Sequence, residues 1–394
     1  MPADDEMTND ERRKYLKKMR KRYQRANRDE KGRLLSEMEA VTGLHRKSLV
    51  RLLNQASLTR LVRPRRARRR TYGVAVEHVV ILVWESLDYL CAERRHPALR
   101  STARQLARFG ELVLTPDLEA QLTTISRATV QRMLSRHPVA SKRLPQRGPE
   151  QANRLRQAVP LGRIPWDTTD VGHCEVDLVH HRGSSAAGEY AHTLQLVDLA
   201  TGWSERVALL GRSQYARETA FRQVLARIPF PIVELHPDNG SEFFNHHLLR
   251  FFGETLTGMQ LSRSRPYHKN DHRLVEQKNA TLVRAYLGQL RLDTPEQVDR
   301  LNGLYDDLWI YSNLFQPVLH LASKMIVNNR VRRTWDTAQT PYQRLLATGQ
   351  LTADANIRLA ELAQQTNPRT LRQRIYRQVA ALWQDHLPLD MAAD

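Results

Sequence analysis

Three acidic residues, Asp177, Asp238 and Glu276, have surroundings that could bring their carboxylates to one chemical site. Asp177 lies inside an alternating apolar run, Asp238 follows a short apolar run and precedes an Asn–Gly pair, and Glu276 lies in a helix-compatible stretch. Three converging carboxylates can hold two hard divalent cations through oxygen ligands, for an in-line displacement at phosphorus. Taken singly, each acid also has a structural explanation, as a turn former or a partner of a helix dipole.

The elements that must position these acids follow a pattern typical of a layered α/β domain. Strands are predicted over residues 173–180, 190–198, 203–210 and 232–235, and the first three read as an antiparallel meander. Helices are predicted over residues 221–228 and from about residue 271. The alternation in the first strand places Glu175 and Asp177 on one face and the apolar residues on the other.

Three stretches around the acids resemble the signature motifs of the integrase-core transposases of bacterial insertion sequences. They are Asp-Asn-Gly-Ser-Glu-Phe at residues 238–243, Pro-Tyr-His at 266–268 and Val-Glu-Gln-Lys-Asn at 275–279. The resemblance covers roughly residues 166–291, with a weaker echo in the helical modules before it. It implies a ribonuclease H-like core in which Asp177, Asp238 and Glu276 are the catalytic triad and hold two Mg²⁺ ions, for which Mn²⁺ can substitute.

The motifs depart from the family pattern in three places. Residues 270–274 stand where an Asn–Gly pair before Val-Glu-Arg is frequent, and Gln277 stands where Arg is common. Between Asp238 and Glu276 lie 37 residues, slightly more than is usual in that family. A longer loop accommodates this spacing, so Glu276 is the preferred third acid and Asp271 is its rival.

The charge of the chain indicates a polyanionic partner. The 394 residues hold 61 Lys and Arg against 42 Asp and Glu, a formal net charge of +19. Residues 1–70 hold 22 basic residues against 9 acidic ones, a net +13, so nucleic-acid binding is expected to concentrate there. No long apolar run or signal peptide is visible, and Cys91 and Cys174 suit neither a disulfide framework nor a zinc site. We therefore expect a cytoplasmic, nucleoid-associated protein with no membrane partner.

Two helical modules before the acids are predicted to bind double-stranded DNA. In the first, over residues 1–59, apolar residues at helical spacing stop at Gly43 and resume at Leu49, the layout of a helix-turn-helix. An Arg-rich linker over residues 60–73 leads to a second helix-turn-helix-like domain over residues 74–141, where Ser126 is a candidate N-cap. A helical hairpin, a solvated spacer and a structural bundle remain the alternatives. The expected DNA contacts are Arg46, Lys47, Arg51, Arg63, Arg65, Arg66, Arg68, Arg69, Arg70, Arg127, Gln131 and Arg132.

The remaining segments complete a multidomain organisation. A linker over residues 142–165 leads into the catalytic core over residues 166–292, and a mostly helical C-terminal region over residues 293–394 follows. The basic residues of that last region fit either phosphate binding or subunit pairing.

Several other polar residues of the core have competing interpretations. Lys278 and Asn279 are expected either to help position DNA or to lie on a solvated helix face. Asp198 is expected to shape a turn, and the histidines to be structural, because Mg²⁺ prefers oxygen ligands. Trp166 and Trp203 are expected in the core.

Together these features predict a DNA transposase. The helical modules would bind the terminal inverted repeats of an insertion sequence, and the acids would support metal-dependent strand cleavage and transfer into target DNA. Because joining two ends requires two active sites, at least a homodimer is expected on DNA. A DNA-binding regulator with a decayed catalytic domain and a nuclease that cuts without joining are the alternatives, although the intact acids count against the regulator.

Overall fold

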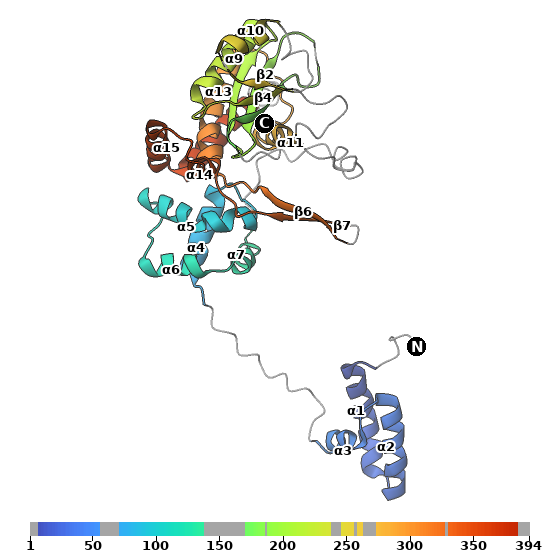
Figure 1. Cartoon of the computed structure of the whole chain (residues 1–394). Helices are drawn as coiled ribbons and strands as arrows, with labels where there is room; N and C mark the ends of the chain where they lie inside the picture. Colours follow the sequence, from blue (N-terminus) through green and yellow to red (C-terminus); the bar gives the residue numbers. More distant parts are fainter. Residues whose placement is uncertain are drawn as a thin grey trace, which may run out of the picture. The chain divides into compact units, whose positions relative to one another are not determined.

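The chain divides into two compact units, unit 1 over Met1–Arg70 and unit 2 over Thr71–Asp394. A computed structural model of the chain describes residues 7–55, 71–137, 170–185, 187–237, 246–255, 258–262, 273–327 and 330–384 (Figure 1). Asp238, Asp271, Trp166, the arginines between residues 60 and 70 and the linker over residues 142–165 lie outside the described residues. None of the described helices is long and apolar enough to cross a membrane.

Unit 1 is a three-helix unit with its own apolar core. Its helices are α1 (Asn9–Arg25), α2 (Arg28–Thr42) and α3 (Arg46–Asn54). A capping box between Thr8 and Glu11 begins α1, and Gly43 ends α2 in the left-handed conformation at φ +67°. Leu35, Met38 and Leu49 are among the side chains buried between the helices. The predicted helix, glycine turn and helix are therefore confirmed.

The first part of unit 2 is a four-helix module. It consists of α4 (Val74–Ser86), α5 (Ala92–Arg108), α6 (Pro116–Thr124) and α7 (Arg127–Leu134). The valines of α4 that recur at helical spacing are buried, as the sequence predicts. Oγ of Ser126 accepts a hydrogen bond from the backbone N–H of Thr129 (3.3 Å), which confirms it as the N-cap of α7.

A five-stranded mixed sheet is the centre of unit 2. Its strands are β1 (His173–His180), β2 (Ala191–Asp198), β3 (Ser204–Leu210), β4 (Glu234–Pro237) and β5 (Gln260–Leu261), in the order β3-β2-β1-β4-β5. The first three strands are antiparallel neighbours, whereas β4 is parallel to β1 and β5 is parallel to β4. The predicted meander is confirmed to within one residue at each strand, and β4 begins two residues later than predicted.

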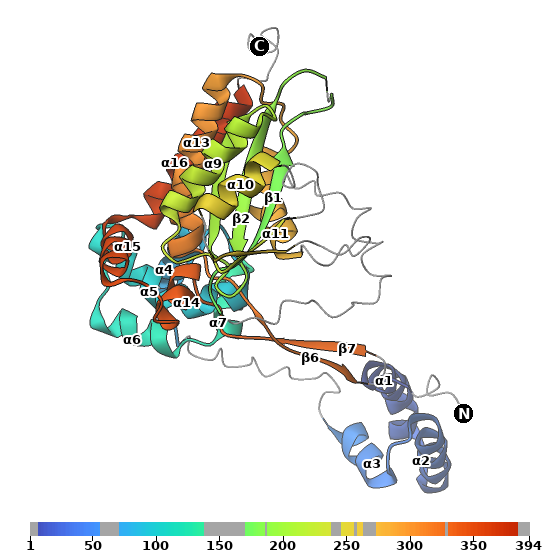
Figure 2. The same ribbon diagram turned by 45° about the horizontal axis from the view of Figure 1, so that its top comes forward.

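Helices cover both faces of this sheet (Figures 1 and 2). On one face α9 (Gln214–Arg227) and α10 (His246–Thr255) pack against Cys174, Val176 and Leu178 of β1. The other face carries α11 (Arg273–Lys278), the π-helix η2 (Asn279–Arg284), α12 (Ala285–Leu287) and α13 (Pro295–Ile310). The face that holds Glu175 and Asp177 is therefore the one covered by α11 and η2.

The C-terminal region departs from the helical prediction at one place. After η3 (Tyr311–Phe315) a two-stranded hairpin follows, made of β6 (Leu321–Val327) and β7 (Arg330–Trp335). The chain then returns to helices, namely α14 (Pro341–Ala347), α15 (Ala353–Gln365) and α16 (Pro368–Gln384). The segment rich in Val, Ile and Thr around residues 326–334 has the composition of strands, which explains the difference.

The four-helix module is fastened to α16 and η3. Asp88, in the turn after α4, has a positive φ of 57°. Its Oδ1 accepts hydrogen bonds from Nε of Arg372 (2.9 Å) and from the hydroxyl of Tyr376 (2.6 Å), both on α16. The hydroxyl of Tyr311 donates to the backbone carbonyl of Ser86 (2.8 Å). The module and the sheet thus share one compact unit, and the predicted boundaries inside it stay predictions.

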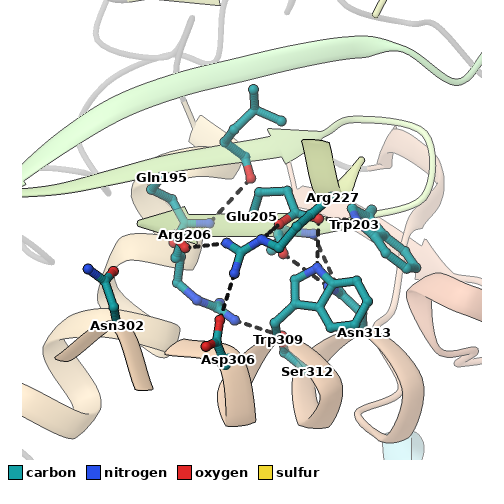
Figure 3. A network of polar contacts seen from close by, with 12 residues as sticks. Gln195, Trp203, Glu205, Arg206, Arg227, Asn302, Asp306, Trp309, Ser312 and Asn313 are labelled. Atoms are coloured by element: carbon teal, nitrogen blue, oxygen red, sulfur yellow. Dashed lines mark hydrogen bonds and ion pairs between the residues drawn. The ribbon is translucent and has the colours of Figure 1, made fainter. Parts of the chain in front are cut away.

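A polar network centred on the buried Glu205 joins the sheet to α9 and α13 (Figure 3). The carboxylate of Glu205 on β3 accepts hydrogen bonds from the indoles of Trp203 (2.8 Å) and Trp309 (2.6 Å). Arg227 of α9 forms ion pairs with Glu205 (3.1 Å) and with Asp306 of α13 (2.8 Å). Burial raises the pKa of Glu205, and its donors offset part of that cost. Trp203 is fully buried, which confirms its predicted place in the core.

Candidate active site

Asp177 lies in the middle strand of the sheet and is held by two hydrogen bonds. Its Oδ2 accepts from Nδ2 of Asn279 on η2 (2.7 Å), and its Oδ1 accepts from the backbone N–H of Leu178 (2.8 Å). Asn279 is buried, and its Oδ1 has no hydrogen-bond partner among the described residues. A half-buried carboxylate and a buried amide oxygen therefore lie side by side at the junction of β1 and η2.

Glu175 is a second acid on the same face of β1, two residues before Asp177. It is only 2% exposed, and its Oε2 accepts a hydrogen bond from the backbone N–H of Val275 in α11 (2.7 Å). Burial is the main cause that raises the pKa of Glu175 to about 7, and the nearby carboxylates of Glu276 and Asp177 raise it further. The carboxylates of Asp177 and Glu276 therefore lie near enough to Glu175 to affect its charge. Sequence analysis missed Glu175 as a site residue, although the alternation of β1 placed it beside Asp177.

Glu276 comes to this place on α11, which packs against β1 and β2. Its side chain is exposed, and Asn279 follows it by three residues, the spacing that puts two residues on one side of a helix. The two predicted catalytic acids that the structure describes, Asp177 and Glu276, are thus brought to one site from distant parts of the sequence.

The remaining predicted acid, Asp238, lies outside the described residues, directly after the last residue of β4. That last residue, Pro237, pairs with Val176 in the parallel register of β1 and β4. Within the described part of the chain, no group of three or more His, Cys, Asp or Glu side chains could hold a metal ion. The described residues thus contain two of the three predicted triad acids.

Lys278 and Asn279 were expected on an accessible surface, but the structure buries both side chains. Both are buried, at 9% exposed, and Nζ of Lys278 lies toward Gly202 rather than toward solvent. Burial lowers the pKa of Lys278 to about 7, and the positive charges of Arg94 and Arg206 lower it further. A role for the two side chains in binding DNA stays a prediction, whereas the contact from Asn279 to Asp177 is a feature of the fold.

The predicted DNA contacts on α3 and α7 are exposed, but some already have partners within the chain. Both terminal nitrogens of the Arg46 guanidinium donate to α2, at Oγ of Ser36 (3.0 Å) and the carbonyl of Gly32 (3.1 Å). Arg127 forms an ion pair with Glu93 (3.3 Å). The other exposed members are Lys47, Arg51, Gln131 and Arg132, while Arg63, Arg65, Arg66, Arg68, Arg69 and Arg70 lie outside the described residues. DNA binding by this set stays a prediction.

Asp198 and His181 have the structural roles that the sequence analysis expected. The carboxylate of Asp198 is buried and accepts from the backbone N–H groups of Gly172 and Thr201 (both 2.8 Å), which closes the turn between β2 and β3. His181 is buried beside Thr193 (2.7 Å), and burial lowers the pKa of its imidazole to about 3.

Sequence comparison shows the family to which the chain belongs. The uncharacterized protein y4rM of Sinorhizobium fredii (strain NBRC 101917 / NGR234) is 35% identical to the chain over 324 residues, which cover 82% of the chain and 91% of the relative. The chain belongs to the y4rM family. No family model matches the chain.

Two solved structures are also similar to this chain. The catalytic core domain of BIV integrase has 15% sequence identity and a TM-score of 0.30, over 45% of this chain and 95% of that one. The catalytic core domain of HTLV-2 integrase, in complex with magnesium, has 16% identity and a TM-score of 0.29, over 38% of this chain and 90% of that one.

Proposed function

We propose that this chain is a DNA transposase of the integrase-core type, which cleaves DNA at the ends of an insertion sequence and transfers the strands into target DNA. The observation that carries the proposal is the convergence of Glu175, Asp177 and Glu276 with Asn279 on one face of the sheet. All four side chains come from residues 166–291, the stretch that the transposase resemblance covers. A ribonuclease H-like core is supported by three antiparallel strands followed by two parallel ones, in the order β3-β2-β1-β4-β5.

Asp238 is proposed as the acid that completes the triad with Asp177 and Glu276. It is the residue after Pro237, and consecutive Cα atoms across a trans peptide are about 3.8 Å apart. Pro237 is the register partner of Val176, the residue before Asp177. This adjacency in sequence to the pairing partner of Val176 supports Asp238, rather than Asp271, as the acid that completes the triad.

The donor set fits a hard divalent cation. Asp177 and Glu276 offer carboxylate oxygens, and Oδ1 of Asn279 is a buried carbonyl oxygen without a hydrogen-bond partner among the described residues. Such oxygens suit Mg²⁺ or Mn²⁺ better than zinc, which favours His and Cys. Asp177, Asp238 and Glu276 would hold two ions, which activate the attacking oxygen and stabilise the leaving oxygen when bound.

The surrounding residues of the chain position these ligands. The hydrogen bond from Asn279 fixes the orientation of Asp177, and Glu175 holds the start of α11 through the Val275 N–H. The active site would first admit water as the nucleophile that frees a 3′-hydroxyl at the element end. The same site would then direct that hydroxyl onto a phosphodiester of the target strand.

The proposed partners are double-stranded DNA and a second copy of the chain. Helices α3 and α7, with their exposed basic residues, would bind the terminal inverted repeats, and at least two chains would be needed to join two ends. A cytoplasmic, nucleoid-associated location follows from this proposal.

One reaction separates the proposal from its alternatives. The full chain is incubated with linear DNA that carries the element's own ends, a target plasmid and Mg²⁺, beside an Asp177→Asn variant. Joined products that the variant does not form support a transposase. Cut but unjoined DNA would identify a nuclease, and bound DNA without cleavage would identify a regulator.

A further inference from the structure

The hairpin of β6 and β7 extends away from the packed body of unit 2 (Figures 1 and 2). Its register pairs Ser323 with Thr334 and Met325 with Arg332. Among the elements that the structure describes, each of the two strands packs extensively only against the other. The seven residues of β6 make a ribbon about 20 Å long at roughly 3.3 Å per residue.

The base of the hairpin is fixed to the body of the unit. The backbone N–H of His320 donates to Oδ1 of Asp336 (2.8 Å), and the N–H of Asp336 donates to the carbonyl of His320 (3.0 Å). Arg344 on α14 forms an ion pair with the same carboxylate (2.7 Å). A ribbon held at its base in this way leaves the body in a defined direction.

The composition of the hairpin is basic and partly apolar. Residues 321–335 contain four cationic residues, Lys324, Arg330, Arg332 and Arg333, and no acidic residue. Arg332 and Arg333 are exposed, and Met325 is 50% exposed. Because neighbouring residues of a strand point to opposite faces, Arg332 and Arg333 carry positive charge on both faces of the ribbon.

We propose that the hairpin is a DNA-binding arm that lies in the major groove of a duplex. A two-stranded ribbon fits the width of the major groove, whose walls are lined on both sides by phosphates. The face that carries Met325 and its register partner Arg332 can meet the base edges. The edges of the ribbon then run along the two phosphate walls, where the long side chain of Arg333 adds positive charge. A free two-stranded hairpin is only marginally stable in water, so an arm of this kind gains order from the surface that it binds.

The test measures binding of the full chain to a fluorescein-labelled, mixed-sequence duplex in EDTA by anisotropy. The double variant Arg332→Gln/Arg333→Gln should bind at least about 10-fold more weakly, and the slope of log K against log salt should become shallower by about 1 to 2. The matched control, Arg358→Gln/Arg377→Gln, removes two exposed arginines from α15 and α16 and should bind as the unaltered chain does. Equal binding by the two double variants would overturn the proposal.

A second measurement tests the groove. On a duplex whose major groove is filled by glucosylated hydroxymethylcytosine, the affinity ratio between unaltered chain and hairpin variant should fall toward one. The ratio should persist when distamycin fills the minor groove instead. The opposite pattern contradicts the major-groove assignment, and a variant that alters only the sedimentation of the DNA-free chain would show that a second copy covers the hairpin. Because the assays contain EDTA, they do not depend on the proposed catalysis, and the two proposals can fail separately.

Discussion

Asn279 donates a hydrogen bond of 2.7 Å from Nδ2 to Oδ2 of Asp177, and this contact ties the π-helix η2 to the middle strand of the sheet. Asn279 follows Glu276 by three residues, so one helical segment both carries an acid and orients another. The positions of Asp177 and Glu276 are therefore coupled through the segment over residues 273–284. A change in that segment is expected to affect both acids.

Removing the charge of any proposed triad acid should abolish chemistry while leaving DNA binding intact. Asp177→Asn, Asp238→Asn and Glu276→Gln keep the side-chain shape but lose a metal ligand, so cleavage and joining should fall by at least about 10³-fold, or roughly 4 kcal/mol in the barrier. Gel assays of strand transfer measure the loss, and DNA binding should stay within a few-fold.

Two further substitutions serve as controls for this experiment. Asp354→Asn alters an exposed acid on α15 and should leave the rate unchanged. Asp271→Asn tests Asp271, the alternative to Glu276 as a triad acid. An inactive Asp271→Asn beside an active Glu276→Gln would show that the third acid is misassigned.

Asn279 should act as a positioning residue whose loss weakens metal binding. Asn279→Ala leaves Oδ2 of Asp177 without its donor, so we expect activity or metal affinity to fall by about 10- to 100-fold. The Mn²⁺ concentration for half-maximal cleavage should rise, which a purely structural defect would not cause. Gln277→Ala, an exposed neighbour on α11, is the matched control. An unchanged Mn²⁺ midpoint for Asn279→Ala would refute the role.

The buried His181 should make the fold sensitive to acid. Its pKa is lowered by burial to about 3, below the ordinary value of 6.5, so the unfolded chain takes up the proton first as the pH falls. The stability that depends on neutral His181 is complete above pH 6.5 and is lost as the pH falls toward 3. Between pH 6.5 and 5 this loss amounts to about 2 kcal/mol.

Urea unfolding at several pH values tests this expectation. His181→Gln should flatten the dependence of the unfolding free energy on pH in that range, whatever its effect on absolute stability. His78→Gln, at an exposed position on α4, should leave the dependence unchanged. Parallel pH curves for His181→Gln and the unaltered chain would contradict the assignment.

The exposed cations of α3 should contribute to binding of the element ends. Lys47→Gln/Arg51→Gln removes two exposed positive charges without touching the buried core of unit 1. If both contact phosphates, the slope of log K against log salt should become shallower by about 2, because each neutralised phosphate contributes roughly 0.9. Anisotropy across a salt series measures the slope. A slope equal to that of the unaltered chain would exclude phosphate contacts by this pair.

The sheet meander could be predicted because polar and apolar residues alternate where a strand is covered differently on its two faces. The bounds of β1 follow from that alternation. The apolar run over residues 232–235 does not alternate, so the register of β4 could not be predicted from it. The structure sets that register by pairing His173 of β1 with Glu234 of β4.

The positioning contacts of the site could not be predicted for a different reason. Asn279 and Asp177 are 102 residues apart in the chain, so no local sequence pattern predicts that they pair. The burial of Lys278 likewise depends on helix packing that local periodicity does not encode. The hairpin of β6 and β7 was not predicted because its basic residues are equally compatible with a helical C-terminal region.

The attachment of Asp88 to α16 has a consequence for how the protein is made. Arg372 and Tyr376 meet Asp88 across 284 and 288 residues of chain, so α4 to α7 leave the ribosome long before their partners exist. Unit 1, compact on contacts within its first 70 residues, has no such delay. Translation that stops before α16 therefore releases a basic three-helix unit ahead of a four-helix module that lacks the partners of Asp88.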